Sequence, residues 1–192
     1  MIDLFAADTP NGKKISIMLE EINLPYKVIP VNLSEGEQFK EDFLKMSPFS
    51  KIPVIKDSDN NKSVFGSGAI LIYLANKTQK FYHKENKINI DQWLMAQMGL
   101  VGPQIGAYHS FYRFNKGKSK YGEERYFKIT KDLYQRLNDR LLVSKYLAGE
   151  EYTIADIATW PWVARHQWHD IGLSNYSSLC KWYEDISKHV HR

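Results

Sequence analysis

Two spacings of apolar residues organise the first 78 positions of this chain. Four apolar residues recur every three or four positions, which predicts an amphipathic helix over 10–23. These four are Ile15, Met18, Leu19 and Ile22. Short runs rich in branched and aromatic residues predict strands at 2–6, at 26–31, directly after Pro53 and at 63–65. Two further helices are predicted over 37–46 and 69–76, with Phe39 and Phe43 on the apolar face of the first.

The resulting order, β-α-β-α-β-β-α, is typical of a small α/β domain whose last two strands form a hairpin. Pro30 has no backbone N–H to give to a neighbouring strand, so the second strand is expected at an edge of the sheet. From residue 90 onward only helical spacing is found. A regular stripe marks one long helix, formed by Tyr126, Ile129, Leu133, Leu137 and Leu141.

Two further features define the second half of the chain. Thr153 and Asp156 stand three residues apart in front of an apolar run, which predicts a helix that opens with a capping box. Leu179, Trp182 and Ile186 predict a last helix. We therefore expect an α/β domain over 1–78, a polar linker over 79–87 and an all-helical domain over 88–192.

Composition narrows the class of protein. The chain has 192 residues, 43% of them hydrophobic and 14% aromatic, enough to bury a sizeable core. No run of 18 apolar residues predicts a membrane span, and the N-terminal residues do not resemble a signal peptide, so a cytoplasmic protein is expected. A single cysteine, Cys180, excludes an internal disulfide, and no Cys/His metal signature is present.

The net charge of +4 is mild for this length. Basic residues are densest between Arg113 and Lys131, where aromatic residues interleave with them, so a nucleic-acid surface has to be considered. The same pattern is typical of a solvated helix face, and this is the interpretation we adopt. We expect neither a nucleic-acid partner nor a membrane partner.

The junction between the first strand and the first helix carries the clearest chemistry. Thr9 is placed as an N-cap and Pro10 at the first helical position. The N–H groups of such a helix start carry partial positive charge and suit an anion or a thiolate. Thr9 and Asn11 add side-chain donors, yet no cysteine lies here, which indicates a thiol cofactor that binds from outside. The same residues also fit an ordinary helix cap followed by a turn residue.

Four stretches, in this order and spacing, resemble the glutathione S-transferase superfamily over essentially the whole chain. They are 9–12, 47–55, 67–74 and 152–163. Within the superfamily the chain resembles the bacterial nu-class and Ure2-like glutathione transferases, which hold glutathione without a catalytic tyrosine or cysteine. In this chain Phe5 has no hydroxyl, and no cysteine precedes Cys180.

The resemblance implies both architecture and activity. It implies a thioredoxin-like N-terminal domain, a helical-bundle C-terminal domain and a homodimer. It implies glutathione as co-substrate, in the reduction of a small disulfide more than in conjugation to an electrophile. The alternative is a non-catalytic regulatory or assembly module of the same fold with a weakened glutathione site.

Individual positions take their roles from the same resemblance. Thr9 and Asn11 match the pair that contacts the thiol and would favour its thiolate, and lowering that pKa by one unit requires only about 1.4 kcal/mol. Pro53 matches a cis-proline, and the backbone of Ile52 would pair with the cysteinyl part of glutathione. Gln38 and Lys51 match positions that reach its glycine end.

The remaining matched positions concern the other end of the ligand and the second domain. Ser67, at a helix start, would hold the γ-glutamyl carboxylate. Arg125 would reach glutathione from the helical domain, although it also fits a surface arginine paired with a nearby acid. Tyr108 and Phe111 would line the cleft for the second substrate. Asp156 matches a structural capping aspartate.

One residue departs from the pattern. Relatives carry an acidic residue or glutamine immediately before the helix-opening serine, and this chain has Gly66. A carboxylate there would meet the ammonium of the γ-glutamyl group, and losing one charged hydrogen bond costs about 1.5–3 kcal/mol. Gly66 therefore fits either a site compensated by another group or the weakened site of a regulatory module.

Overall fold

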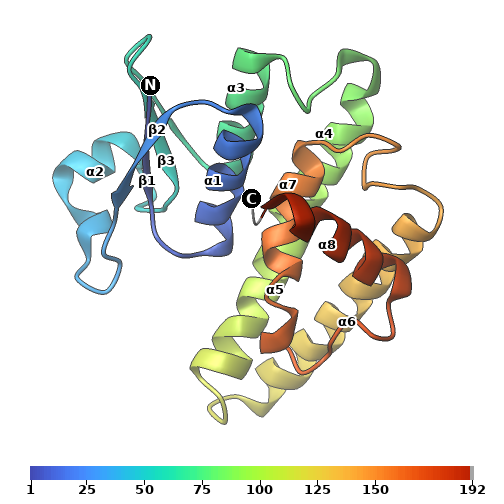
Figure 1. The fold of residues 1–192 in the computed structure, drawn as a ribbon. Helices are drawn as coiled ribbons and strands as arrows, with labels where there is room; N and C mark the ends of the chain where they lie inside the picture. The colour runs from blue at the N-terminus through green and yellow to red at the C-terminus, as the bar shows by residue number, and fades with distance from the viewer. Residues whose placement is uncertain (191–192) are drawn as a thin grey trace. The chain divides into compact units, whose positions relative to one another are not determined.

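A computed structural model describes residues 1–190 and divides the chain into two compact units, the first ending at His83 and the second beginning at Lys84 (Figure 1). The first unit is a four-stranded sheet with helices, and the second is helical. The predicted fold class, a thioredoxin-like domain followed by a helical domain, is confirmed. No helix within the described residues has the length and apolar character needed to cross a membrane.

The sheet of the first unit has the order β2-β1-β3-β4. The strands are β1 (Ile2–Ala6), β2 (Tyr26–Pro30), β3 (Val54–Asp57) and β4 (Lys62–Phe65). β2 runs parallel to β1, whereas β3 is antiparallel to both β1 and β4. β2 lies at the edge, as the lack of a backbone donor at Pro30 predicted.

Helices cover both faces of this sheet (Figure 1). α1 (Pro10–Ile22) and α3 (Ser67–Thr78) pack together on one face, and the short α2 (Glu41–Met46) lies on the other. Phe5 of β1 is half-buried on the α2 face, where it packs against the cluster of the buried residues Phe43 and Val54. Leu4, one position earlier, is buried on the opposite face because side chains alternate along a strand.

The prediction of one helix over 37–46 is wrong in one respect, because the helix is interrupted at Lys40. Lys40 is extended, with φ −63° and ψ 143°, and separates η1 (Glu37–Phe39) from α2. The Glu37 carboxylate accepts hydrogen bonds from the Asn32 N–H and the Lys40 ammonium, each at 2.8 Å, which holds this stretch as a separate turn. Phe39 is consequently 63% exposed, whereas Phe43 is buried as predicted.

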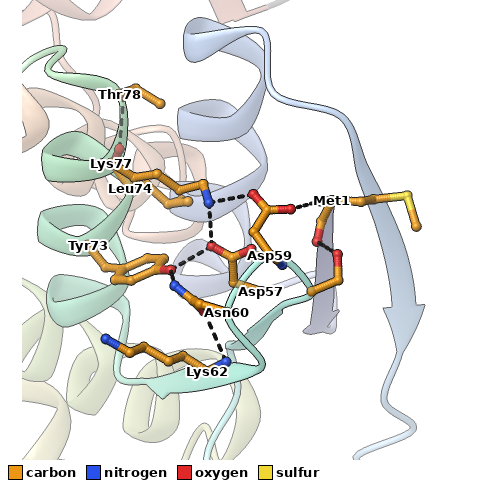
Figure 2. Close-up of polar contacts among 10 residues, drawn as sticks. Met1, Asp57, Asp59, Asn60, Lys62, Tyr73, Leu74, Lys77 and Thr78 are labelled. Atoms are coloured by element: carbon orange, nitrogen blue, oxygen red, sulfur yellow. Dashed lines mark hydrogen bonds and ion pairs between the residues drawn. The ribbon is translucent and has the colours of Figure 1, made fainter.

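A polar network ties the β3–β4 hairpin to α3 (Figure 2). Asp57 is fully buried, and its carboxylate accepts hydrogen bonds from the Tyr73 hydroxyl at 2.5 Å and the Lys77 ammonium at 2.8 Å. Lys77 also lies 2.7 Å from Asp59, which pairs with the ammonium group of Met1 at 3.1 Å. Burial raises the pKa of Asp57, but the hydrogen bonds from Lys77 and Tyr73 outweigh it and hold that pKa below its usual range. The network fixes α3 against the sheet.

The second unit is built from helical segments that follow one another along the chain. They are η2 (Lys84–Asn86), α4 (Lys87–Ala96), η3 (Gln97–Val101), α5 (Gly102–Tyr108), η4 (His109–Phe114), α6 (Lys120–Leu142), α7 (Ile154–Val163), η5 (His166–Trp168) and α8 (Ser177–Val190). The segments η3 and η4 are π-helical and alternate with α4 and α5 without a break in the chain. The stretch 87–114 is therefore a helical run with two wide turns, a geometry often found at functional sites.

The predicted capping box opens α7. The Thr153 side chain accepts a hydrogen bond from the N–H of Ala155, and the Asp156 carboxylate accepts one from the N–H of Thr153. Asp156 is fully buried and also accepts hydrogen bonds from the Leu147 N–H and the Trp182 indole, each at 3.0 Å. This aspartate therefore joins α7, α8 and the preceding loop, which is more than a cap alone would do.

Candidate functional site

The predicted residues of the first unit lie along one edge of the sheet. This is the edge at which β1, β2 and β4 end and β3 begins, not the outer strand β2. Phe5 near the end of β1 lies opposite Val54 at the start of β3, and Val54 lies opposite Phe65 at the end of β4. β2 is parallel to β1 and ends at the same edge. The segments that leave or enter this edge carry Thr9, Asn11, Gln38, Lys51, Ile52, Pro53 and Ser67.

The start of α1 is formed as the sequence predicts. Thr9 is the N-cap and its Oγ1 accepts a hydrogen bond from the Gly12 N–H at 3.1 Å. The hydroxyl proton of Thr9 donates to no acceptor among the described residues, so it can serve a ligand. A Cβ at Gly12 would lie 2.4 Å from the carbonyl oxygen of Ala7, which is why only glycine permits this close approach. Asn11 follows in the first turn and is half-buried.

The loop that enters β3 is fixed by a residue that sequence reasoning assigned no role. Ser47 is fully buried, and its hydroxyl donates to the Lys51 carbonyl at 2.8 Å and accepts from the Lys51 N–H at 3.2 Å. This reciprocal pair shapes the backbone directly before Ile52. The Ile52–Pro53 peptide bond is cis, as predicted. Ser47 could have been found from the sequence, because the serine stands four residues before the paired backbone.

The side chain of Gln38 is only partly hydrogen-bonded within the described residues. Its side-chain nitrogen donates to the Leu33 carbonyl at 3.4 Å, but its buried Oε1 has no hydrogen-bond partner among the described residues. An orphan acceptor at this edge fits a ligand that brings a donor group. Lys51 is exposed, so its ammonium can reach an anionic ligand from solvent. Both observations are compatible with the roles expected for these residues.

Ser67 is the first residue of α3 and is almost fully buried. The residue before it, Gly66, has φ 83° and ψ 115°, a backbone conformation that L side chains rarely adopt. A Cβ built on Gly66 would meet no atom within 4 Å, so the space beside Ser67 is open. Gly66 therefore differs from the acidic residue or glutamine of the family pattern in its backbone conformation and in its lack of charge. Crowding does not require a glycine here.

A lysine that sequence reasoning overlooked lies directly behind Ser67. Lys14 is 1% exposed, and its Nζ lies 3.3 Å from the Ser67 Oγ. Burial lowers the pKa of Lys14 to about 7. A signal was available, because Lys14 precedes Met18 by four residues and so shares the apolar face of α1. A charged residue on such a face is a candidate for function.

The predicted residues of the second unit differ in accessibility. Arg125 of α6 is exposed, and its Nη1 lies 3.5 Å from the Tyr121 hydroxyl. The Phe111 ring stacks on Tyr126, with centroids 5.4 Å apart. Tyr108 is 1% exposed, and its hydroxyl donates to the His169 carbonyl at 3.0 Å. Tyr108 is thus committed to the core of this unit, and the cleft role of both aromatic residues stays a prediction.

The buried surroundings of Tyr108 contain a chain of titratable side chains. The Nε2 atoms of His109 and His169 are 2.6 Å apart, and Nδ1 of His169 is 2.6 Å from the Tyr134 hydroxyl. Burial lowers the pKa of His109 to about 4 and that of His169 to about 3. Arg165 and Arg113 reinforce the shift at His109, and His109 and His166 reinforce it at His169. Both imidazoles are therefore neutral at physiological pH.

The basic stretch considered for nucleic acid lies on η4 and α6 and makes contacts within the second unit. The Arg113 guanidinium lies 4.3 Å from the centroid of Trp168, and the Lys116 ammonium lies 4.5 Å from that of Tyr112. Lys120 pairs with Glu124 at 3.7 Å. The contacts are those of a solvated helix surface. Within the described residues, no three His, Cys, Asp or Glu side chains gather as a metal site would require.

Comparison with known proteins gives the same picture in both units. The family model described as glutathione S-transferase, N-terminal domain, matches residues 2–76, and that for the C-terminal domain matches residues 95–189. The disulfide-bond oxidoreductase YfcG of Escherichia coli strain K12 is 45% identical over 97% of this chain and 90% of its own length.

Two solved structures are similar over nearly their whole length. A glutathione transferase homologue from Lodderomyces elongisporus, with two GSH per subunit, has a TM-score of 0.93 and 34% identity, covering 99% of this chain and 95% of that one. A glutathione transferase family member from Pseudomonas fluorescens, with two glutathione bound, has a TM-score of 0.90 and 36% identity, covering 100% and 91%.

Proposed function

The chain belongs to the glutathione S-transferase family, and from this premise we propose that it binds glutathione and uses its thiolate to reduce small disulfides. Conjugation of glutathione to electrophilic carbon is a secondary activity of the same site. The observation that carries the proposal is the edge of the sheet where the N-cap of α1 and the start of α3 converge. Two helix starts and their side-chain donors serve an anionic thiol there, and the first unit supplies no cysteine of its own.

The chemistry assigns a task to each end of the ligand. The Thr9 hydroxyl and the Asn11 amide donate to the sulfur, and with the start of α1 they favour the thiolate over the thiol. The thiolate attacks one sulfur of a disulfide, forms a mixed disulfide and releases the other sulfur as a thiolate, which takes a proton from water. Attack by a second glutathione then yields oxidised glutathione and the second reduced thiol. Arg125 is the residue we assign to a carboxylate of this second glutathione.

Glutathione is oriented by the remaining segments at the sheet edge. The backbone of Ile52, presented by the cis peptide to Pro53, pairs with the cysteinyl part. Gln38 and Lys51 take the glycine end, where the orphan oxygen of Gln38 accepts an N–H. Ser67 takes the γ-glutamyl carboxylate. The second substrate, a small disulfide or electrophile, binds against Phe111, whereas Tyr108 lies in the core of the second unit and supports this region from behind.

A non-catalytic regulatory module is the competing function, and Gly66 is the observation that favours it. Calorimetric titration with reduced and oxidised glutathione separates the two. We expect binding at micromolar to low millimolar strength, with a preference for the oxidised form, which fills the sites of both glutathione molecules. No heat at about 10 mM of either ligand, a free energy weaker than about −3 kcal/mol, would assign the regulatory function instead.

The enzyme assay has a matched control in Cys180. Its thiol is half-buried, lies 3.6 Å from the Glu184 carboxylate and has a raised pKa because of burial and that carboxylate. It is therefore a poor nucleophile. Cys180→Ser should keep glutathione-dependent disulfide reduction within about twofold of the unmodified chain. A folded Cys180→Ser protein with more than about tenfold lower activity would show that the protein's own sulfur takes part.

We propose that the protein acts as a cytoplasmic homodimer. The cytoplasm maintains the reduced glutathione pool that the reaction consumes. Phe49 and Phe65 support the dimer, because they are 72% and 43% exposed with ring centroids 6.4 Å apart, an apolar pair on the surface of the first unit. Light scattering of the purified protein tests this, and Phe49→Ser should shift a dimer towards the monomer.

A further inference from the structure

We propose that a cavity at the C-terminal end of α6 binds a free α-amino acid with an apolar side chain, whose ammonium group meets Glu150 and whose carboxylate meets Lys145. The cavity has a volume of about 370 Å³ and is lined by residues of the second unit. This volume falls in the range of about 300–1,000 Å³ that is typical of small-molecule sites. The cavity uses none of the residues assigned to glutathione, so the inference goes beyond the proposed function.

Fixed elements form the apolar part of the cavity. Leu141 near the end of α6 and Trp182 of α8 both line it and are both buried. The Trp182 indole donates to the buried Asp156 carboxylate at 3.0 Å, which holds the ring in place. The hydroxyl of Ser144, which is buried in the loop after α6, donates to the Tyr146 carbonyl at 2.8 Å. An apolar side chain can therefore enter a preformed space without ordering the protein first.

A tight turn sets two opposite charges beside this space. Tyr146 and Gly149 form an antiparallel bridge, with N–H···O distances of 2.8 and 3.3 Å. Lys145 and Glu150 flank the bridge, and both line the cavity. The Lys145 ammonium lies 5.3 Å from the centroid of the Tyr146 ring. Neither Lys145 nor Glu150 forms an ion pair in the part of the chain that the structure describes, so both charges can serve a ligand.

The balance of charge around the cavity selects the class of ligand. Its other two charged residues, Lys181 and Asp185, pair with each other, and Lys188 lies 2.9 Å from the same carboxylate. Lys181 and Lys188 lower the pKa of Asp185 to about 2, so its charge is already compensated. One cation and one anion remain, at Lys145 and Glu150. A ligand of single charge would satisfy only one of them, whereas a zwitterion satisfies both.

Two hydroxyl groups add hydrogen-bonding capacity to the wall. Tyr146 and Ser178 line the cavity, and neither hydroxyl has a hydrogen-bond partner among residues 1–190 as described. Burial, with the carboxylates of Asp156 and Asp185, raises the pKa of Tyr146. The Tyr146 hydroxyl therefore keeps its proton and can donate to the carboxylate that Lys145 attracts.

Calorimetric titration with three probes tests the class of ligand. L-Phenylalanine carries both charges, phenethylamine lacks the carboxylate, and 3-phenylpropionate lacks the ammonium. We expect L-phenylalanine to bind with a Kd of about 1 mM or below, and each analogue to bind about three- to tenfold more weakly. No saturable binding of L-phenylalanine at about 20 mM, or an analogue that binds as tightly, would overturn the proposal.

Variants locate the preference in this cavity. Lys145→Gln should abolish the preference over phenethylamine, and Glu150→Gln the preference over 3-phenylpropionate, each leaving the other preference intact. Lys131→Gln is the matched control, because the Lys131 ammonium also lies over a ring, 5.6 Å from the centroid of Phe127, and does not line the cavity. Ser178→Phe would fill the cavity and should abolish binding of L-phenylalanine.

The melting temperature of each variant shows that it is folded, and the two exposed positions decide the outcome if Ser178→Phe does not fold. Folded Lys145→Gln and Glu150→Gln chains that keep both preferences would overturn the proposal. A preference lost in Lys131→Gln would assign the effect to net charge and would overturn it as well.

Discussion

His109 and His169 lie with their Nε2 atoms 2.6 Å apart in the core of the second unit, although 60 positions separate them in the sequence. One proton lies between the two rings, so one imidazole donates and the other accepts. Tyr134 holds the far side of the His169 ring through its Nδ1. Adding a proton to the accepting ring would place two donors against each other, and adding one to the donating ring would bury a positive charge. The pair is therefore stable only while both rings are neutral.

This pair predicts a loss of stability in mild acid. The unfolded chain protonates histidine near pH 6.5, whereas the folded chain holds the pKa of His109 at about 4 and that of His169 at about 3. Below about pH 6.5 the unfolded state therefore binds more protons, and the free energy of unfolding falls by up to about 1.4 kcal/mol per pH unit for each ring. Urea unfolding at about pH 7, 6 and 5 measures the slope.

The control for this prediction is His169→Gln, which removes one titrating ring and keeps a polar side chain. Between about pH 6.5 and 5, the free energy of unfolding of this variant should fall with decreasing pH at roughly half the rate of the unmodified chain. Comparing the two slopes cancels the contribution of every other titrating group. Equal slopes would show that the buried histidines do not govern acid stability.

Thr9 combines a structural and a proposed chemical task, and two substitutions separate them. Thr9→Asp keeps an oxygen that can accept the Gly12 N–H, so the helix cap survives and stability should change by less than about 0.5 kcal/mol. It replaces the hydroxyl donor by a negative charge beside the glutathione sulfur. We expect kcat/KM for disulfide reduction to fall by at least about 100-fold. Thr9→Ser keeps both tasks and should retain activity within about fivefold; equal activity of all three chains would remove Thr9 from the mechanism.

Asp156 should be among the most sensitive positions for stability. Asp156→Ala would leave the buried N–H groups of Leu147, Thr153 and Trp182 without their acceptor. We predict a loss of more than about 3 kcal/mol in the free energy of unfolding, well above the 0.5–2 kcal/mol typical of a cap alone. Asp139, whose carboxylate accepts from exposed Gln135, is the control: Asp139→Ala should cost less than about 0.5 kcal/mol. A loss for Asp156→Ala in the range of a simple cap would show that the other contacts contribute little.

Gly66 allows the weakened end of the site to be rebuilt. Gly66→Glu would place a carboxylate in open space beside the γ-glutamyl ammonium and should raise glutathione affinity by about tenfold. The positive φ of 83° should make the same change cost about 1–2 kcal/mol of stability. Gly66→Ala imposes that backbone cost without the carboxylate, so its affinity should stay unchanged. Calorimetry and thermal unfolding of both variants decide whether charge or backbone limits binding.

Local patterns predicted most of the first unit. The spacing of Ile15 and Met18 indicated α1, and the missing N–H of Pro30 placed β2 at the sheet edge. The helix over 37–46 failed because the contacts of the Glu37 carboxylate with Asn32 and Lys40 outweigh helical spacing in so short a segment. Apolar periodicity carries no information about such polar contacts.

Long-range polar contacts are the features that could not be predicted from the sequence. The pairing of Lys14 with Ser67 joins residues 53 positions apart, and that of His109 with His169 joins residues 60 apart. Neither is visible in local spacing, because each arises only when separate helices pack. Family resemblance identified Ser67 through its motif, but it provided no reason to single out a lysine inside the apolar face of α1.

The two π-helical segments between Lys87 and Phe114 set the direction in which the later side chains of this run point. A π turn contains one residue more than an α turn, so each segment sets the following residues back by about 100° around the helix axis relative to an uninterrupted helix. The orientation of His109 towards His169 thus depends on η3, several residues upstream. Deleting a single residue within Gln97–Val101 would restore regular winding and leave His109 pointing in the same direction, because the lost residue and the lost wide turn cancel. A one-residue deletion in the regular winding of α5 has no wide turn to cancel it and would rotate the histidine off its partner.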